Sequence, residues 1–250
     1  MFEYKTILPS PFTDKDYYFS PEFAFYYIQE VSGRHMMKHG TGIPHLLKED
    51  KSWVLLHTHL EFYKKVYWQT ELTISTHAFK PKGITVPRVV ECVTDKGDKV
   101  FSSYSLWGVV EAKNGVHRLI NPSSVTDRVG YDDETPFKMP PRLKRIDNLE
   151  KLVLLKQEKR TIHYNDIDIN GHVNNLKYSS WIVSALSEND FLNDNSIKEM
   201  DILFSKELRA NDSVTVSLYK NQDGSYYATI NDAAFASIKI GKIEKECFNV

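Results

Sequence analysis

The order of the expected secondary structure constrains the fold of this chain more than any other feature, because one order occurs twice. In the first half, a strand-like segment and a long helix-like segment precede four strand-like segments, and the second half repeats this order. Consecutive strands after a helix favour an antiparallel sheet with the helix packed on one face. The halves share this order rather than their residues, so we expect an α+β fold of two similar units.

The first half begins with a strand-like segment at 2–8 and a polar loop. Ser20 and Pro21 favour a helix start, because serine caps helices and proline suits the first helical position. Apolar residues within 23–37 recur at three- and four-residue spacing, which predicts a helix with one buried face. Segments that alternate and are rich in β-forming residues predict four strands, at 53–64, 69–78, 84–94 and 99–112.

Residues 120–156 interrupt this pattern. They contain four prolines, several Ser and Asp residues, and a basic cluster of Arg142, Lys144 and Arg145. This composition is typical of a connector, and its length indicates that it is packed on the surface of the units it joins. We therefore expect an N-terminal unit over 1–119, the connector over 120–156 and a C-terminal unit over 157–250.

The second half predicts a strand near 159–164 and a helix at 174–187, whose serines are small enough to allow close approach to a sheet. Four further strands are expected at 197–209, 212–220, 225–231 and 234–243.

Charge and cysteine content exclude several classes of protein. Lys and Arg total 32 against 33 Asp and Glu, so the whole chain lacks the basic excess of nucleic-acid or anionic-membrane binders. Cys92 and Cys247 are far apart and form no disulfide framework, which favours a reducing compartment. No apolar stretch approaches the ~20 residues needed to span a bilayer, and the first residues alternate like a strand. We expect a cytoplasmic protein without membrane insertion.

The stretch 165–175 is the strongest candidate for a functional site. It places Asp168, Asn170 and His172 where a strand turns into a helix, and N–H groups in the first turn of a helix can bind an oxyanion. Asp, Asn and Gly are also ordinary turn residues, and Asn174 can cap the helix without further purpose. His172 favours function, because histidine is not a favoured cap and its unperturbed pKa is near neutrality.

Glu207 is the best candidate outside this turn, at the end of a strand-like run. Its simpler interpretation is a solvated carboxylate beside Lys206 and Arg209.

Two histidine pairs are weaker candidates. His35 and His39 are four apart on the first helix, and His57 and His59 face the same side of a strand. Neither pair has an obvious third ligand, so packing or surface roles are favoured over metal binding. The chain also lacks a Gly-rich phosphate loop and a Gly-x-Ser-x-Gly elbow, which argues against nucleotide-dependent and ordinary serine hydrolase chemistry.

The long motif around the turn resembles a known family. It reads Asp168-x-Asn170-x-His172-Val173-Asn174-Asn175-x-Lys177-Tyr178, with Glu207 and then Asn211-Asp212-Ser213-Val214 further on. This pattern is similar to the catalytic half of the acyl-acyl carrier protein (acyl-ACP) thioesterases. Trp53 to Leu56 and the segment around Trp107 are similar to the N-terminal half of that family, so the resemblance covers nearly the whole chain.

The resemblance implies a tandem hot dog fold, in which each unit wraps an antiparallel sheet around a long helix. It also implies hydrolysis, in fatty acid biosynthesis, of the thioester between a fatty acyl chain and the phosphopantetheine arm of acyl carrier protein, with no cofactor or metal. Two other functions remain open: an acyl-CoA thioesterase of the same fold, and a non-catalytic acyl-binding protein. A tandem fold is compatible with a monomer or a homodimer.

The same resemblance implies that Asp168, Asn170, His172 and Glu207 are catalytic. Our hypothesis is that Glu207 and His172 hold and deprotonate a water, that Asp168 orients them, and that Asn170 and backbone N–H groups stabilise the developing charge. Plant members place a cysteine after the glutamate, where this chain has Leu208, so a thiol mechanism is not available there.

The resemblance also places the acyl chain between the first helix and the sheet of the N-terminal half. The aromatic candidates to line or plug this tunnel are Phe23, Phe25, Tyr26 and Tyr27, for which plain core packing is an equal alternative. The basic cluster of Arg142, Lys144 and Arg145 is a candidate landing patch for the acidic carrier protein.

Overall fold

The computed structural model describes residues 1–113, 116–129, 131, 149–187, 192 and 195–246. The first elements are β1 (Phe2–Ile7), α1 (Ala24–Lys38), α2 (Ile43–Leu47), β2 (Lys51–Phe62), β3 (Lys64–Lys65), β4 (Glu71–Ala78), β5 (Val86–Thr94), β6 (Lys99–Lys113) and β7 (Val116–Ile120). They are followed by α3 (Ser123–Thr126), β8 (Val153–Thr161), α4 (Asn175–Ser187), β9 (Ser196–Phe204), β10 (Ser213–Lys220), β11 (Tyr226–Ile230), β12 (Ala234–Gly241) and β13 (Glu244–Lys245). Single 3-10 turns occur as η1 (Ser10–Phe12), η2 (Pro21–Phe23), η3 (Leu149–Lys151) and η4 (Tyr164–Asp166).

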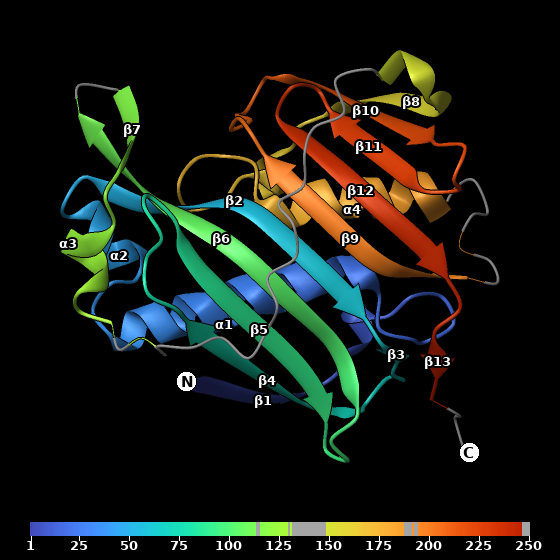
Figure 1. The fold of residues 1–250 in the computed structure, drawn as a ribbon, viewed down its shortest axis with the longest axis horizontal. Coiled ribbons are helices and arrows are strands. Elements are labelled where there is room, and N and C mark those ends of the chain that lie inside the picture. The colour runs from blue at the N-terminus through green and yellow to red at the C-terminus, as the bar shows by residue number, and fades with distance from the viewer. Residues whose placement is uncertain (114–115, 130, 132–148, 188–191, 193–194, 247–250) are drawn as a thin grey trace.

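One 11-stranded sheet runs through both halves in the order β1-β4-β5-β6-β2-β9-β12-β11-β10-β8, with β7 paired to β6 (Figure 1). Read inward from each edge, the two halves have the same order, since β1-β4-β5-β6-β2 corresponds to β8-β10-β11-β12-β9. The halves join where β2 and β9 pair antiparallel, with Thr58 opposite Ile202. This repeat confirms the expected α+β fold of two similar units.

The long helices α1 and α4 both lie on one face of the sheet, behind it in Figure 1. They meet near its centre, where Gln29 on α1 donates to the side-chain oxygen of Asn174 at 3.1 Å. Apolar side chains of both helices are fully buried against the strands, among them Ile28 and Leu186. Burial of this shared face is the main stabilising contribution to both units.

The two helices begin differently. Asn174 caps α4 as expected, because its side-chain oxygen accepts the N–H of Leu176 at 2.9 Å. The expectation that Ser20 caps the first helix is wrong: its hydroxyl donates to the Glu22 carboxylate at 2.5 Å and makes no cap hydrogen bond. A single 3-10 turn, η2, precedes α1, so the helix itself starts at Ala24.

Three strands, β7, β8 and β9, differ from the expectation. β8 starts at Val153 rather than near 159, because its early residues pair with the end of β10, where Val153 is opposite Lys220. β9 ends at Phe204, so Glu207 lies in the segment after the strand. β7 was not expected and pairs with the end of β6.

The basic cluster at 142–145 lies outside the described residues, and the unit boundaries at 119 and 156 stay a prediction.

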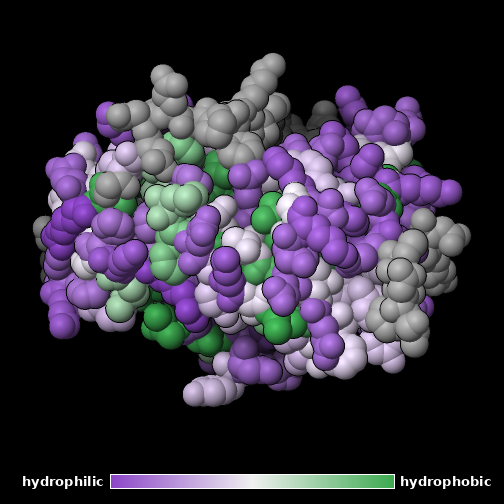
Figure 2. Space-filling view, turned by 90° about the horizontal axis from the view of Figure 1, so that it is seen from below, coloured by the Kyte–Doolittle hydropathy of each residue, from purple (hydrophilic) through white to green (hydrophobic). Residues whose placement is uncertain are grey.

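No helix among the described residues is long and apolar enough to cross a membrane. The face of the molecule in Figure 2 is mainly hydrophilic, with small hydrophobic patches between polar side chains.

His57 and His59 lie at the junction between the halves, where β2 pairs with β9. Asp201 on β9 contacts His57 with one carboxylate oxygen and lies 2.8 Å from Nδ1 of His59 with the other. His59 also lies 3.2 Å from the Glu61 carboxylate. Burial lowers the pKa of His59, but its contacts with Asp201 and Glu61 together outweigh burial and raise it overall. Burial raises the pKa of Asp201, but its contacts with His57 and His59 outweigh burial and lower it overall.

Asp201→Asn is expected to destabilise the protein most between about pH 4 and 6.5. The raised pKa of His59 gives stability that is full below its unfolded pKa and is lost as pH rises through the folded value. The lowered pKa of Asp201 gives stability that is full above its unfolded pKa and is lost as pH falls through the folded value. Denaturant unfolding at pH 5.5 should show a loss of about 1–3 kcal/mol, and a smaller loss at pH 9.

Asp232→Asn serves as the control, because Asp232 is 63% exposed and pairs with the exposed Lys206 at 3.5 Å. Its effect should be close to zero at both pH values. An Asp201→Asn loss as large at pH 9 as at pH 5.5 would contradict a protonated histidine at this junction.

Candidate active site

The carboxylate of Asp168 holds the loop between β8 and α4. Its Oδ1 atom accepts the backbone N–H groups of Asn170 at 2.8 Å and of His172 at 3.3 Å. In return, the N–H of Asp168 donates to the carbonyl of His172 at 2.8 Å. Gly171 takes φ of +78°, which glycine adopts without steric cost. These contacts close a tight turn, so the backbone from which the His172 side chain projects is fixed.

The segment that follows β9 lies against this loop. The N–H of Val173 donates to the carbonyl of Leu208 at 2.8 Å. The side chain of Leu208 is only 3% exposed and belongs to the hydrophobic core. Because Leu208 is anchored in this way, the preceding Glu207 is held beside His172.

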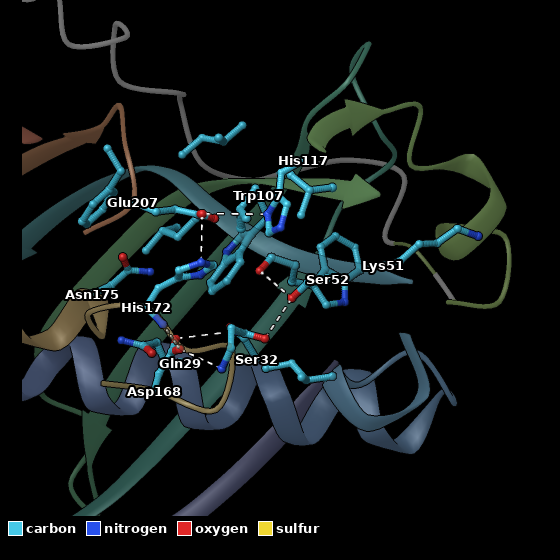
Figure 3. Close-up of a pocket in the computed structure, with 18 of the residues that line it drawn as sticks. Gln29, Ser32, Lys51, Ser52, Trp107, His117, Asp168, His172, Asn175 and Glu207 are labelled. Atoms are coloured by element: carbon cyan, nitrogen blue, oxygen red, sulfur yellow. Dashed lines mark hydrogen bonds and ion pairs between the residues drawn. The ribbon is translucent and has the colours of Figure 1, made fainter. Parts of the chain in front are cut away.

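Glu207 and His172 are in direct contact (Figure 3). Nε2 of His172 lies 3.1 Å from Oε2 of Glu207, a hydrogen-bond distance. The His172 side chain is 14% exposed and that of Glu207 is 36% exposed, so the pair is shielded but still open to water. A carboxylate beside an imidazole is suited to accepting a proton from a bound water.

Two further basic side chains approach the same carboxylate oxygen. Nδ1 of His117, from β7 of the N-terminal half, lies 3.9 Å from Oε2 of Glu207, and a guanidinium nitrogen of Arg209 lies 4.0 Å from it. The rings of His117 and His172 are also neighbours, with centroids 6.0 Å apart. The site is therefore built from both halves of the chain.

Asn170 is held from the N-terminal half as well. The hydroxyl of Ser52 on β2 donates to Oδ1 of Asn170 at 3.1 Å, and Nδ2 of Asn170 lies 3.4 Å from Oδ2 of Asp168 (Figure 3). Because the side-chain oxygen of Asn170 accepts the Ser52 hydroxyl, the amide nitrogen of Asn170 faces away from Ser52.

The four predicted site residues all line one cavity of about 620 Å³. It continues between α1 and the strands of the N-terminal half, where apolar side chains such as Trp53, Val86 and Trp107 form its walls. Tyr178 lies at the reacting end, and burial raises the pKa of its hydroxyl, which therefore stays protonated at neutral pH. The cavity occupies the place in which we expected an acyl chain, and that occupancy stays a prediction.

The aromatic residues expected to line or plug this space do not line it. Phe25 and Tyr27 are almost fully buried in the core, with 0% and 1% exposed. Phe23 stacks on Phe12 with centroids 4.5 Å apart, and Tyr26 meets the same ring edge-on. None of the four side chains lines the cavity, and all four belong to the core or pack against it, which supports the core-packing alternative.

The histidine pairs have other contacts. His35 is buried and accepts from the Arg88 guanidinium at 3.2 Å, while His57 and His59 contact Asp201 as described above. Within the described part of the chain, no group of three His, Cys, Asp or Glu side chains is arranged to hold a metal ion.

Sequence reasoning missed the residues that the N-terminal half contributes. Ser52 and His117 reach the site from β2 and β7, and Gln29 from α1 binds Asn174 at the start of α4. None of them belongs to a local motif. The pairing of β2 with β9 and of β7 with β6, together with the packing of α1, brings these distant segments to the site.

Family models of the acyl-ACP thioesterase N-terminal and C-terminal domains match residues 7–125 and 151–243. The chain belongs to the acyl-ACP thioesterase family. Within this family, it is 27% identical over 153 residues to a chloroplastic palmitoyl-acyl carrier protein thioesterase of Cuphea hookeriana. That alignment covers 57% of this chain and 35% of the plant protein, so the matched part is about a third of the relative's length.

Solved structures of acyl-ACP thioesterases have the same fold. The 12:0-ACP thioesterase of Umbellularia californica gives a TM-score of 0.81 at 18% identity, with 96% of each chain covered. An acyl-ACP thioesterase of Bacteroides thetaiotaomicron gives 0.76 at 18% identity, with 95% of this chain and 96% of the other covered. These matches confirm the tandem hot dog architecture.

Proposed function

We propose that this acyl-ACP thioesterase family member hydrolyses the thioester between a fatty acyl chain and the phosphopantetheine arm of acyl carrier protein. The products are the free fatty acid and the carrier protein thiol. The contact of 3.1 Å between His172 and Glu207, on the wall of a largely apolar cavity, is the observation that carries this proposal. Family membership supports the reaction class and the carrier-bound substrate.

In the proposed reaction, the His172–Glu207 pair removes a proton from a water that attacks the thioester carbonyl carbon. Because the two side chains share a hydrogen bond, the proton belongs to the pair rather than to either residue. Collapse of the tetrahedral intermediate breaks the carbon–sulfur bond. The leaving thiolate then takes the proton from the His172–Glu207 pair, so the pair returns to its starting state.

The developing oxyanion needs donors that are fixed before the reaction. Asn170 can supply the amide N–H that does not face Asp168, because Ser52 and Asp168 hold that side chain. Asn175 is the first residue of α4 and lines the cavity, and N–H groups in the first turn of a helix have no intrahelical partner. We assign oxyanion stabilisation to these two groups and the positioning of the loop to Asp168.

The substrate assignment is tested with purified protein and matched pairs of acyl-ACP and acyl-CoA thioesters that carry chains of about eight to eighteen carbons. We expect carrier-bound chains to be cleaved with kcat/KM at least about tenfold above that of the matching CoA esters, since a protein surface adds contacts that free coenzyme lacks. Release of free thiol measures the rate.

Cleavage of CoA esters alone would leave the site assignment in place and reject the carrier protein. No cleavage of either class by a folded protein that still binds fatty acids would instead support a non-catalytic acyl-binding role. The same titration reports the preferred chain length.

A further inference from the structure

A buried positive charge lies in the wall of the cavity, away from the reacting groups. Arg88 on β5 is only 3% exposed and lines the cavity. Its guanidinium donates to the Thr76 hydroxyl at 2.9 Å and to Nδ1 of His35 at 3.2 Å. Among the described residues no carboxylate forms an ion pair with it. Burial lowers the pKa of Arg88 to about 10, so the group is still charged at neutral pH.

A buried hydroxyl lies on the opposite wall. Ser32 on α1 is 5% exposed and lines the same cavity, and its Oγ atom has no hydrogen-bond partner among the described residues (Figure 3). It precedes His35 by one helical turn, so it lies on the face of α1 that contacts Arg88. Buried polar groups are normally hydrogen-bonded, and leaving one unpaired costs stability.

Arg88 lies away from the reacting pair. Its strand, β5, is separated by β6 and β2 from β9, the strand that precedes Glu207, which gives three inter-strand steps of about 4.8 Å, or roughly 14 Å across the sheet. Ser32 lies one turn of α1 beyond Gln29, which binds Asn174. The space between is lined largely by apolar side chains such as Trp53 and Trp107. We call Arg88 and Ser32 the polar end of the cavity.

A purely hydrocarbon chain would offer no acceptor to the remaining guanidinium N–H groups of Arg88 and no partner to the Ser32 hydroxyl. An oxygen atom carried by the chain would accept a hydrogen bond from Arg88, and a hydroxyl could also pair with Ser32. Sites built to hydrogen-bond a substrate oxygen discriminate strongly against analogues that lack it, because the buried groups of the site are then unpaired.

We propose that the polar end binds an oxygen atom near the end of the acyl chain remote from the thioester, so that the preferred substrates are oxygenated acyl chains. This inference rests on the function proposed above. The shared chemistry is a hydrogen-bond acceptor in a hydroxyl or a carboxylate, and the two sources are separated by experiment.

The test compares three carrier-bound substrates of equal carbon number that end in a methyl, a hydroxyl or a carboxyl group. We expect kcat/KM for at least one oxygenated chain to exceed that of the methyl chain by about tenfold or more, as for hydrogen bonds to a charged group. A preference for the carboxyl-ended chain identifies the charge of Arg88 as the main contributor to selectivity. A preference for the hydroxyl-ended chain indicates that the hydroxyl accepts from Arg88 and also pairs with Ser32.

Two variants assign the preference to the polar end. Arg88→Met should abolish it, and Ser32→Ala should reduce it by about threefold or more. Ser103→Ala is the matched control, because Ser103 on β6 is 2% exposed and its hydroxyl also has no partner in the described part of the chain, but it does not line the cavity. Both serine variants remove an unpaired hydroxyl, so neither should lower the melting temperature. Only Ser32→Ala should change the substrate ratio.

Equal kcat/KM for all three chain ends, or a preference that both Arg88→Met and Ser32→Ala leave unchanged, would overturn the inference while hydrolysis itself stands. Calorimetric binding of the corresponding free fatty acids gives an independent result. If no thioester is cleaved but oxygenated acids bind more tightly than methyl-ended acids, and Ser32→Ala removes the difference, the polar end is supported and the hydrolase function fails.

Discussion

His172→Ala is expected to lower turnover at least about 10²-fold with little change in stability. The imidazole contacts Glu207 at 3.1 Å from a loop that backbone hydrogen bonds hold in place, so its removal should delete the proton acceptor without unfolding the turn. Steady-state rates at saturating acyl-ACP measure the effect, and the melting temperature checks the fold.

His77→Ala is the control for this change. His77 lies on β4, stacks on Phe79 and does not line the cavity, so its removal should leave the rate unchanged. Near-normal turnover in a folded His172→Ala protein would reject the imidazole as part of the proton-accepting pair.

Glu207→Gln is expected to lower turnover by about 10²-fold or more while keeping the size of the side chain. A neutral amide beside His172 cannot take up the charge that develops when the water loses its proton. It also leaves His117 and Arg209 without the carboxylate that they approach at 3.9 and 4.0 Å. Single-turnover hydrolysis separates this loss from any change in product release.

Glu199→Gln provides a closely matched control. The Glu199 side chain is 36% exposed, as is that of Glu207, and it pairs with a cation, Lys239, at 2.7 Å. It does not line the cavity. Equal rate losses in the two variants would show that removing any half-buried carboxylate slows the protein, and the catalytic assignment of Glu207 would fail.

Much of the fold could be predicted because local patterns match the final structure. Alternation and helical spacing gave the type and order of the long elements, and the structure confirms both helices and the repeated strand order. Strand ends were less predictable. Val153 belongs to β8 because β10 offers it an edge to pair with, and both Val153 and Leu154 are exposed, so burial gave no signal.

The site residues also divide into those that the local sequence predicts and those that it does not. The contacts of Asp168 with the N–H groups of Asn170 and His172 are local, so the turn could be predicted from its residues. The place of Glu207 depended on the family resemblance. Ser52 and His117 could not be found, because their positions depend on long-range pairing of strands.

The seam between β2 and β9 has a consequence for how this protein can change. Ser52 supports Asn170, and His117 approaches Glu207, so the N-terminal half supports two reacting groups of the C-terminal half. The N-terminal half also forms most of the cavity wall. Exchanging N-terminal halves between two members of the family would therefore change more than the preferred acyl chain. It would also change the contacts that hold the groups that activate water. Chimeras should keep full rates only when the residues that meet across the seam are exchanged together.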